Sequence, residues 1–345
     1  MRPVRKPLHA MAMVAMLAAL GHAPLASAQD APPAPRPPVT PHIERMDPAL
    51  DAIVDAAQPV ERVATGFVFT EGPMWVKDRL FFSDVRDDKM YSVTPDGKVE
   101  VLNPHSGGLA EHPLHVDVGS NGMAPSPGNT AVVARMGARD IARMEAPGHM
   151  KPFITHYEGK RLNSPNDVVY APDGALWFTD PPFGLGYLKD GAKAAQELPF
   201  SGVFRYAGGK LTAPITDMPL PNGIGFSPDG KTLYVDNFGP EGYLRAYDLG
   251  ADGKLSNMRV VISFPGRQGP DGLKVDMAGN IWMTGPGGIR IITPQGKVLG
   301  QIRLPETAAN LAFAQDGHTL YITGSTSIYR LHTRVAGEMP RYAQR

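Results

Sequence analysis

The sequence contains no cysteine, and its 34 lysine and arginine residues are balanced by 34 aspartate and glutamate residues. The absence of cysteine excludes a disulfide scaffold. The charge balance argues against a surface for nucleic acid or another polyanion and favours a neutral small molecule as the ligand. Four catalytic signatures are also missing, namely a GxSxG nucleophile elbow, a Walker loop, an HExxH zinc pair and a dinucleotide fingerprint between a strand and a helix.

The first residues have the features of an export signal. Arg2, Arg5 and Lys6 form a basic start, and residues 10–20 form an apolar run that is too short to span a bilayer. Residues 26–28 (Ala-Ser-Ala) provide a small-residue cleavage site. We therefore predict a signal peptide over residues 1–28, with an N-terminal membrane anchor as the alternative. Because export of a cysteine-free chain suits the bacterial periplasm, we expect a periplasmic or secreted protein that is free of the membrane after cleavage.

Proline and glycine are frequent, with 35 and 38 residues respectively. Much of the proline near the N-terminus lies in the stretch APPAPRPPVTP, so residues 29–44 are predicted to form an extended linker. The remaining chain has too many hydrophobic residues, 42% overall, to be disordered. This mixture is typical of many short strands joined by tight turns, and it predicts a single all-β domain over residues 45–345.

Six short segments repeat one pattern, a turn followed by an apolar pair and a polar end. Several follow a clear turn sequence, such as APDG at 171–174 and SPDG at 227–230. A strand that recurs in this way predicts a repeat architecture. The segments span residues 79–84, 129–134, 175–180, 232–236, 280–284 and 319–323.

Counting back nine to eleven residues from the first large apolar residue of each segment reaches an oxygen-bearing side chain every time. The gaps between these positions, 39 to 56 residues, are close to the period of about 40–50 residues in propeller blades. Because the first strand of a blade lines the central channel, we predict a six-bladed β-propeller with these side chains in a ring at the channel mouth. The ring residues are Glu71, Asn121, Asn166, Asn222, Asp271 and Asn310.

This ring has two carboxylates and four amides, with no histidine in register. Calcium accepts six to eight such oxygen ligands in loose geometry, whereas magnesium prefers a smaller, water-rich octahedron. Two negative charges also match one divalent cation. The alternative interpretation is that asparagine and aspartate occur here because their side chains cap strand-entry turns.

The last repeat is short of one strand. Residues 310–313, 320–323 and 327–331 are predicted as its strands, and the chain then ends. Residues 60–65, just ahead of the first innermost strand, belong to no other blade. Because an open ring would leave unpaired strand edges, we predict that residues 60–65 supply the outer strand of the last blade.

Four motifs resemble the senescence marker protein/gluconolactonase family of calcium-dependent six-bladed propellers, a resemblance that runs from about Asp47 to Arg330. They are TEGPMW (70–75), NSPNDVVYAPDGALWFTDPPFG (163–184), PNGIGFSPDGKTLYV (221–235) and GPDGLKVDMAGNIW (269–282). The resemblance implies a hydrolase that opens small sugar lactones such as gluconolactone.

The same resemblance implies roles for individual residues. It places Ca²⁺ on Glu71, Asn166, Asn222 and Asp271, with other divalent cations as substitutes. It makes Asp271 the candidate general base as well as a ligand. Asn121 and Asn166 are expected to orient hydroxyl groups of the lactone substrate.

Two segments leave the substrate open. Many bacterial gluconolactonases carry a Glu-His pair after the second strand of the second blade, where this chain has Arg135-Met136. The loop over residues 181–199, with Tyr187, Lys189 and Asp190, resembles the family's cover of the channel mouth, but a plain surface loop is the alternative. Two other functions therefore stay open: a phosphotriesterase-like or other lactone or ester hydrolase on the same propeller, and a non-catalytic periplasmic binding protein.

Overall fold

The protein is described from a computed structural model. The described residues are 39–109, 117–126, 130–186, 194–266 and 269–338, all in the second of two compact units, residues 39–345. The predicted signal peptide lies outside them. The described chain is all-β, and its helices are two short 3-10 turns, Pro48–Ala52 and Phe183–Leu185. No helix among the described residues has the length and apolar character needed to cross a membrane.

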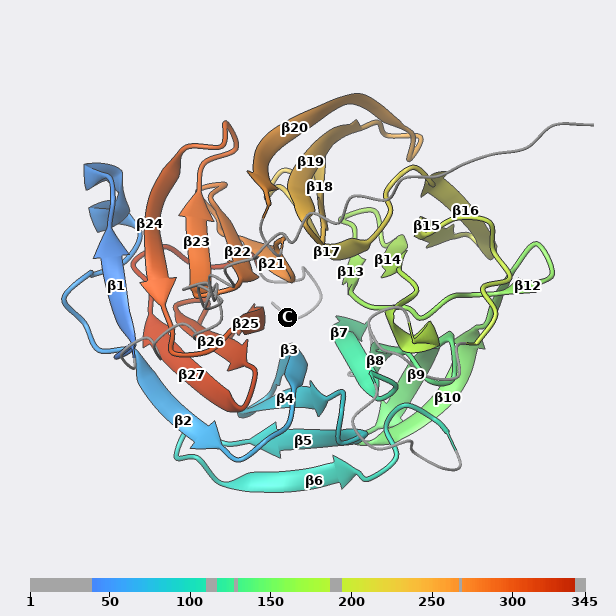
Figure 1. Cartoon of the computed structure of the whole chain (residues 1–345), viewed down its shortest axis with the longest axis horizontal. Helices are drawn as coiled ribbons and strands as arrows, with labels where there is room; N and C mark the ends of the chain where they lie inside the picture. Colours follow the sequence, from blue (N-terminus) through green and yellow to red (C-terminus); the bar gives the residue numbers. More distant parts are fainter. Residues whose placement is uncertain (1–38, 110–116, 127–129, 187–193, 267–268, 339–345) are drawn as a thin grey trace, which may run out of the picture. The chain divides into compact units, whose positions relative to one another are not determined.

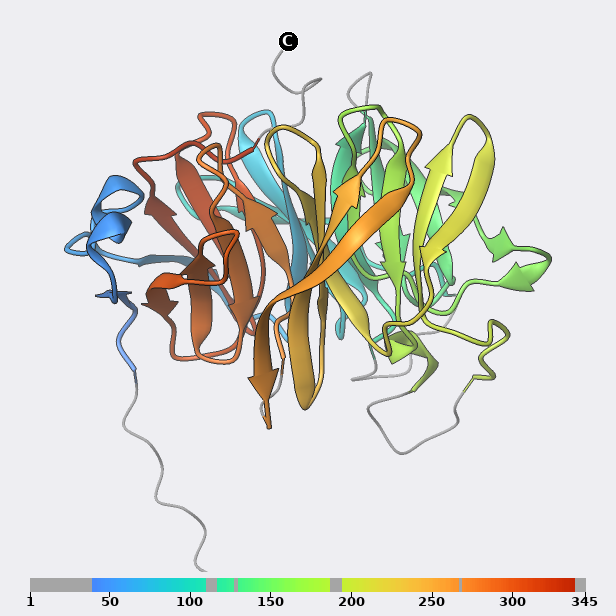
Figure 2. The same ribbon diagram turned by 90° about the horizontal axis from the view of Figure 1, so that it is seen from above.

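Four antiparallel sheets have four strands each, joined in sequence order. The first holds β3 (Thr70–Val76), β4 (Arg79–Asp84), β5 (Lys89–Val93) and β6 (Val99–Asn103), and the second holds β7 (Ser120–Ser126), β8 (Thr130–Arg135), β9 (Asp140–Ala146) and β10 (His149–Ile154). The third holds β13 (Val168–Tyr170), β14 (Leu176–Asp180), β15 (Gly202–Ala207) and β16 (Lys210–Ile215), and the fourth holds β17 (Pro221–Phe226), β18 (Thr232–Asn237), β19 (Glu241–Leu249) and β20 (Leu255–Pro265). These sheets are arranged like propeller blades, as Figure 1 and Figure 2 show from two directions.

The remaining long strands form one nine-stranded sheet, with β21 (Leu273–Val275) paired to β22 at its side. Its other strands are β1 (His42–Arg45), β2 (Glu61–Thr65), β22 (Ile281–Gly285), β23 (Gly288–Ile292), β24 (Val298–Arg303), β25 (Ala308–Phe313), β26 (Thr319–Gly324) and β27 (Ser327–His332). A single residue pair, Gly285 with Ala308, joins β22 to β25. A separate hairpin pairs β11 (His156–Tyr157) with β12 (Lys160–Arg161).

The six predicted repeat strands are confirmed as β4, β8, β14, β18, β22 and β26 within the described residues. Each pairs antiparallel with the innermost strand just before it. The prediction for the last blade is also confirmed, because β2 pairs antiparallel with β27, with Glu61 opposite Arg330. The N-terminal part of the domain thus covers the strand edge left by the end of the last repeat.

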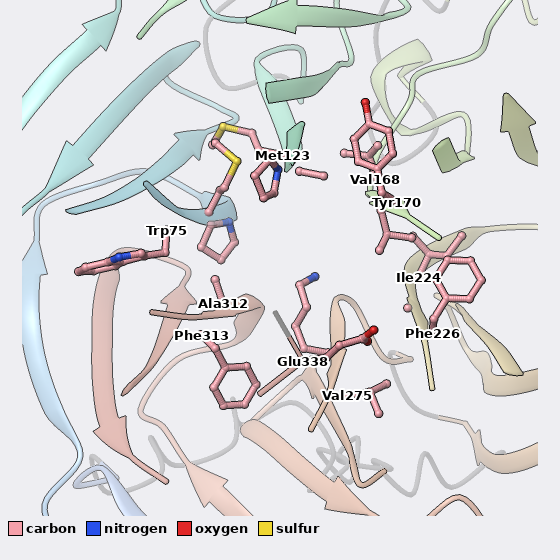
Figure 3. Close-up of a pocket in the computed structure, with 17 residues that line it drawn as sticks. Trp75, Met123, Val168, Tyr170, Ile224, Phe226, Val275, Ala312, Phe313 and Glu338 are labelled. Atoms are coloured by element: carbon pink, nitrogen blue, oxygen red, sulfur yellow. The ribbon is translucent and has the colours of Figure 1, made fainter. Parts of the chain in front are cut away.

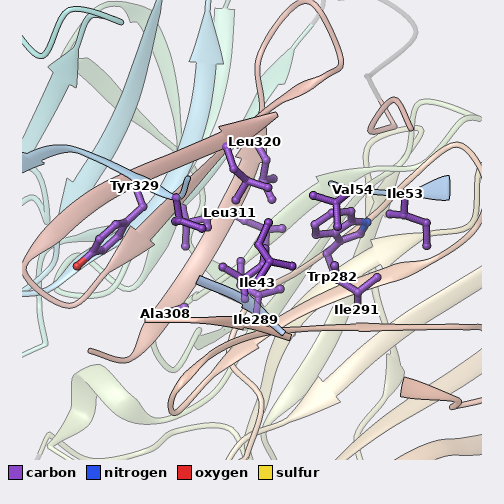
Figure 4. Packing of buried hydrophobic residues seen from close by; sticks show 14 of the residues in the cluster. Ile43, Ile53, Val54, Trp282, Ile289, Ile291, Ala308, Leu311, Leu320 and Tyr329 are labelled. Carbon is purple, nitrogen blue, oxygen red and sulfur yellow. The ribbon is translucent and has the colours of Figure 1, made fainter. Parts of the chain in front are cut away.

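Strand β1 was not predicted, and three of its residues, 42–44, fall within the predicted linker 29–44. It pairs with the outer strand β24, so among the described residues paired structure begins at His42 rather than at residue 45. Four residues beside a proline give too short a pattern to reveal a strand. Its one buried side chain, Ile43, joins the core cluster that contains Trp282 (Figure 4).

Strand β4 shows why the repeat strands are so apolar. Successive side chains of a strand point to opposite faces of the sheet. Leu80 and Phe82 therefore pack into a cluster with Tyr321 of β26, while Phe81 packs on the other side with Val133 of β8. Because neighbouring sheets cover both faces, both sets of side chains are apolar, and the innermost strands are held in fixed positions.

Candidate metal centre and active site

All six predicted ring residues lie at the beginning of an innermost strand. Glu71, Asn121, Asn222 and Asn310 lie within β3, β7, β17 and β25, and Asn166 and Asp271 lie two residues before β13 and β21. All six are buried, with exposed fractions from 2% to 7%. The six positions that were counted from the sequence therefore all lie at the same end of the innermost strands.

Main-chain hydrogen bonds tie the ring residues of neighbouring sheets together. The N–H of Gly122 donates to the carbonyl of Asn166 at 2.7 Å, and the N–H of Gly223 donates to the carbonyl of Asp271 at 2.7 Å. A Cβ atom on either glycine would lie 2.6 Å from the same carbonyl oxygen, which is too close. Glycine at these two positions is therefore required by the approach of the next sheet.

Hydroxyl groups on the second strands make further bonds between sheets. Ser83 Oγ donates to the carbonyl of Asn121 at 2.9 Å, and Thr179 Oγ1 donates to the carbonyl of Asn222 at 2.8 Å. The main chain of the ring is thus fixed from both sides, which limits the movement of its side chains. The glycines after the ring residues and the hydroxyl residues near the ends of the second strands are sequence signals that the sequence analysis did not use.

Three of the ring amides have an oxygen without a hydrogen bond. The Oδ1 atoms of Asn121, Asn166 and Asn222 are buried and have no hydrogen-bond partner among the described residues. Burial of such an oxygen without a partner is costly, so it indicates a ligand position. Asn310 is different, because its Oδ1 accepts the N–H of Leu311 at 2.9 Å and its Nδ2 donates to Glu71 Oε2 at 3.2 Å. Asn310 therefore orients Glu71.

The two carboxylates of the ring are perturbed by burial. Burial raises the pKa of Asp271 to about 7, although a hydrogen bond from Asn222 Nδ2 to Asp271 Oδ1, 2.7 Å long, opposes the shift. Burial, and then the charge of Asp271, raise the pKa of Glu71 well above its usual range. A bound cation would counteract both shifts, since positive charge stabilises the ionised form.

These donors fit calcium. The oxygens are two carboxylates and three amide carbonyls, all hard ligands of the kind that Ca²⁺ prefers. Within the part of the chain that the structure describes, no group of three or more histidine, cysteine, aspartate or glutamate residues could hold a metal, so a site here depends on the amides. Zinc, which prefers nitrogen and sulfur, suits this set poorly.

Met136, the residue directly after β8, contacts the ring residue Asn121. Its sulfur accepts a hydrogen bond from Asn121 Nδ2 at 3.5 Å. The preceding residue, Arg135, is instead held by Asp140 through two hydrogen bonds of 2.8 and 2.5 Å, and both of these side chains are buried. Of the pair that replaces the Glu-His pair of many gluconolactonases, the structure therefore brings only Met136 to the ring.

The start of the loop over residues 181–199 is anchored to the rest of the domain. Ser164 Oγ donates to the carbonyl of Pro181 at 2.5 Å and accepts the N–H of Gly184 at 2.9 Å. Phe183 is buried in the cluster that also contains Met136. This end of the loop is therefore not a plain surface segment, whereas the predicted cover residues 187, 189 and 190 lie outside the described residues.

Comparison with known proteins places the chain in a family. Residues 69–326 match the family described as the SMP-30/Gluconolactonase/LRE-like region. A gluconolactonase from Zymomonas mobilis is 35% identical over 311 residues, which are 86% of this chain and 87% of that protein. The solved structure of a gluconolactonase from Xanthomonas campestris is 33% identical, with a TM-score of 0.75, and the match covers 87% of this chain and 98% of that one.

A more distant solved structure, the calcium-binding protein regucalcin from Agrobacterium tumefaciens, shares the fold. It has a TM-score of 0.62 at 20% identity, and the match covers 80% of this chain and 94% of that one. The family match extends over most of the domain, from just before Glu71 to just beyond the last repeat strand. The chain therefore belongs to the SMP-30/gluconolactonase/LRE-like family.

Proposed function

We propose that this protein is a calcium-dependent lactonase that opens small lactones, such as gluconolactone, to hydroxy acids. The observation that carries the proposal is the set of buried oxygens at one level of the channel, two carboxylates and three amide oxygens without hydrogen bonds. Relatives named gluconolactonase, at 33% and 35% identity over most of the chain, support lactone hydrolysis as the reaction.

The proposal includes a propeller of six blades. Its support is the nine-stranded sheet, in which one residue pair, Gly285 with Ala308, links two halves. One half has β21 as its innermost strand, just after Asp271, and the other has β25, which contains Asn310. If these halves are counted as two blades, they and the four separate sheets make six blades, and each blade then has one ring residue.

Glu71, Asn166, Asn222 and Asp271 would hold the calcium ion, which when bound polarises the lactone carbonyl and lowers the pKa of a nearby water. Asp271 would take a proton from the attacking water. Its Oδ1 accepts the Asn222 amide, so the proton would go to Oδ2. Water oxygen then bonds to the carbonyl carbon, the ring C–O bond breaks, and the released ring oxygen takes up the proton, which yields a hydroxy acid.

Two amides at the same level would orient the substrate. The Oδ1 atoms of Asn121 and Asn166 have no partner in the described structure, so each can accept a hydrogen bond from a lactone hydroxyl. Because the Nδ2 of Asn121 donates to the Met136 sulfur, the orientation of this amide is fixed and its oxygen stays free to accept a hydrogen bond. Asn166 would contribute either as a ligand of the cation or as a substrate contact.

The proposed location is the periplasm or the exterior of the cell. It rests on the sequence features of residues 1–28, and it implies a linker that ends where strand β1 begins at His42. Mass spectrometry of the mature protein from a periplasmic fraction should give an N-terminus at Gln29. An intact N-terminus on protein in the membrane fraction would support the anchor instead.

The test of function is a substrate panel with metal control. Purified protein should hydrolyse sugar lactones, lose that activity in a calcium chelator, and regain it with added calcium. Apolar lactones and phosphotriesters belong in the same panel, because the same metal centre could serve them. Turnover of none of these substrates in calcium-loaded protein would favour the non-catalytic binding protein, and full activity of metal-free protein would contradict the metal centre.

A further inference from the structure

Four carboxylates lie close enough together to influence one another, although the proposed metal centre uses only Glu71 and Asp271. The other two, Asp167 and Asp236, are buried with exposed fractions of 2% and 0%. Asp236 Oδ1 accepts the N–H of Gly223, the residue after the ring residue Asn222, at 3.1 Å. The region around the metal centre therefore holds two acidic side chains beyond those of its proposed ligands.

One of these carboxylates has a cationic partner. Lys274 Nζ lies 3.9 Å from Asp167 Oδ2 and donates a hydrogen bond of 3.1 Å to the carbonyl of Leu273. Asp167 Oδ1 accepts the N–H of Val168 at 2.9 Å, whereas its Oδ2 has no hydrogen-bond partner among the described residues. Of the four carboxylates, only Asp167 forms an ion pair in the part of the chain that the structure describes. Among the described residues, Lys274 is thus the one ammonium group that forms an ion pair with these four side chains.

The surroundings of Lys274 reduce the screening of its charge by solvent. It lines a pocket farther along the innermost strands than the ring residues, and the walls include Met74, Met123 and Phe226 (Figure 3). Lys274 and Glu338 are the charged residues among the lining residues described. Its side chain is 29% exposed. A charge between apolar walls is screened less than a surface charge, so it acts more strongly on the neighbouring carboxylates.

We propose that Lys274 is a built-in counter-cation of the metal centre, which pairs with Asp167 and sets how tightly the centre holds a divalent ion. This inference rests on the calcium site proposed above. A divalent ion balances the two ligand carboxylates, Glu71 and Asp271, but not Asp167, which is paired with Lys274. The ammonium group of Lys274 has two opposite effects, because it stabilises the cation-free protein by attracting carboxylates and weakens calcium binding by repelling the ion.

The test is the variant Lys274→Met, which removes the charge and keeps an unbranched side chain among apolar walls. Calcium should bind this variant about tenfold more tightly than the wild type, since one nearby positive charge is lost. Its Tm should be lower than that of the wild type, and the difference should be larger in chelator than in saturating calcium. Lys274→Arg keeps the charge and should bind calcium as the wild type does, and Lys210→Met, at an exposed position of β16, is the matched surface control. Calorimetric titration with calcium and thermal unfolding measure both quantities.

The outcomes separate this inference from the proposal on which it rests. If the wild type binds no calcium, the proposed metal centre fails. If the wild type binds calcium but Lys274→Met has the wild-type Kd and loses the same Tm with and without calcium, Lys274 has only a packing role and the inference is overturned. If Lys274→Met folds only in the presence of calcium, the inference is supported, because the ion then replaces the missing counter-charge.

Discussion

Asp271→Asn should separate the chemical step from metal binding. The substitution keeps the shape of the side chain but removes one negative charge and the proposed proton acceptor. Its amide oxygen can still accept the 2.7 Å hydrogen bond from Asn222 Nδ2, so the ring should keep its geometry. A general base contributes about 10²- to 10⁴-fold, so kcat at saturating calcium should fall at least about a hundredfold, which is about 2.7 kcal/mol.

Glu71→Gln is the matched control, because it removes the same charge from the same ring. Glu71 Oε2 accepts the N–H of Gly72 at 2.6 Å and the Nδ2 of Asn310 at 3.2 Å, and a glutamine oxygen can accept both bonds. This variant should need more calcium, about tenfold or more for one lost charge, but approach the wild-type kcat when calcium saturates it.

The assay is a calcium titration of lactone hydrolysis at fixed pH for both variants, with calcium Kd measured separately by calorimetry. The separate Kd ensures that the rates are compared at full occupancy. If Asp271→Asn reaches a near wild-type kcat once calcium is bound, Asp271 is a ligand only. The base would then have to be another group, and the proposed route of the proton would be wrong.

Three further predictions concern the fold. Deletion of residues 1–38 should leave the Tm unchanged, whereas deletion of 1–66 should prevent soluble expression, because it removes β1 and β2; a 1–66 deletion that folds as stably as the full chain refutes the closure. Gly122→Ala should lower the Tm by several degrees even in calcium, since the new Cβ would lie 2.6 Å from the Asn166 carbonyl oxygen; an unchanged Tm contradicts the close approach. Burial raises the pKa of Asp180 to about 7. As the pH rises, the carboxyl group therefore loses its proton at a lower pH in the unfolded chain than in the folded one. The free energy of unfolding should fall between about pH 4 and 7, by up to roughly 4 kcal/mol. Asp180→Asn should flatten that dependence in denaturant titrations at pH 5 and 8; an equal slope for both proteins refutes the assignment.

The repeat strands and the level of the ring could be predicted because both depend on short-range patterns. Leu80, Phe81 and Phe82 of β4 pack to alternate sides, so the apolar run directly reflects two covered faces. The ring residues stand at a nearly constant distance before such runs. The position of Glu71 could therefore be counted without knowledge of any contact.

Other features depend on contacts between sheets, which no local pattern encodes. Lys274 lies on β21 and Asp167 directly before β13 of another sheet, so their ion pair becomes visible only when the sheets are assembled. Asn310 has the same residue type and register as Asn222, but its oxygen is used by its own neighbour's N–H. Strand β1 consists of four residues with one buried side chain, too few to show a period.

The proposed calcium site is tested most directly by a crystal structure of the calcium-loaded protein with anomalous scattering data. We expect one strong anomalous peak at the ring, with oxygens of Glu71, Asn166, Asn222 and Asp271 at about 2.3–2.6 Å from the ion. An anomalous peak only at another position, or catalytically active crystals without an ion at the ring, would contradict the proposed site.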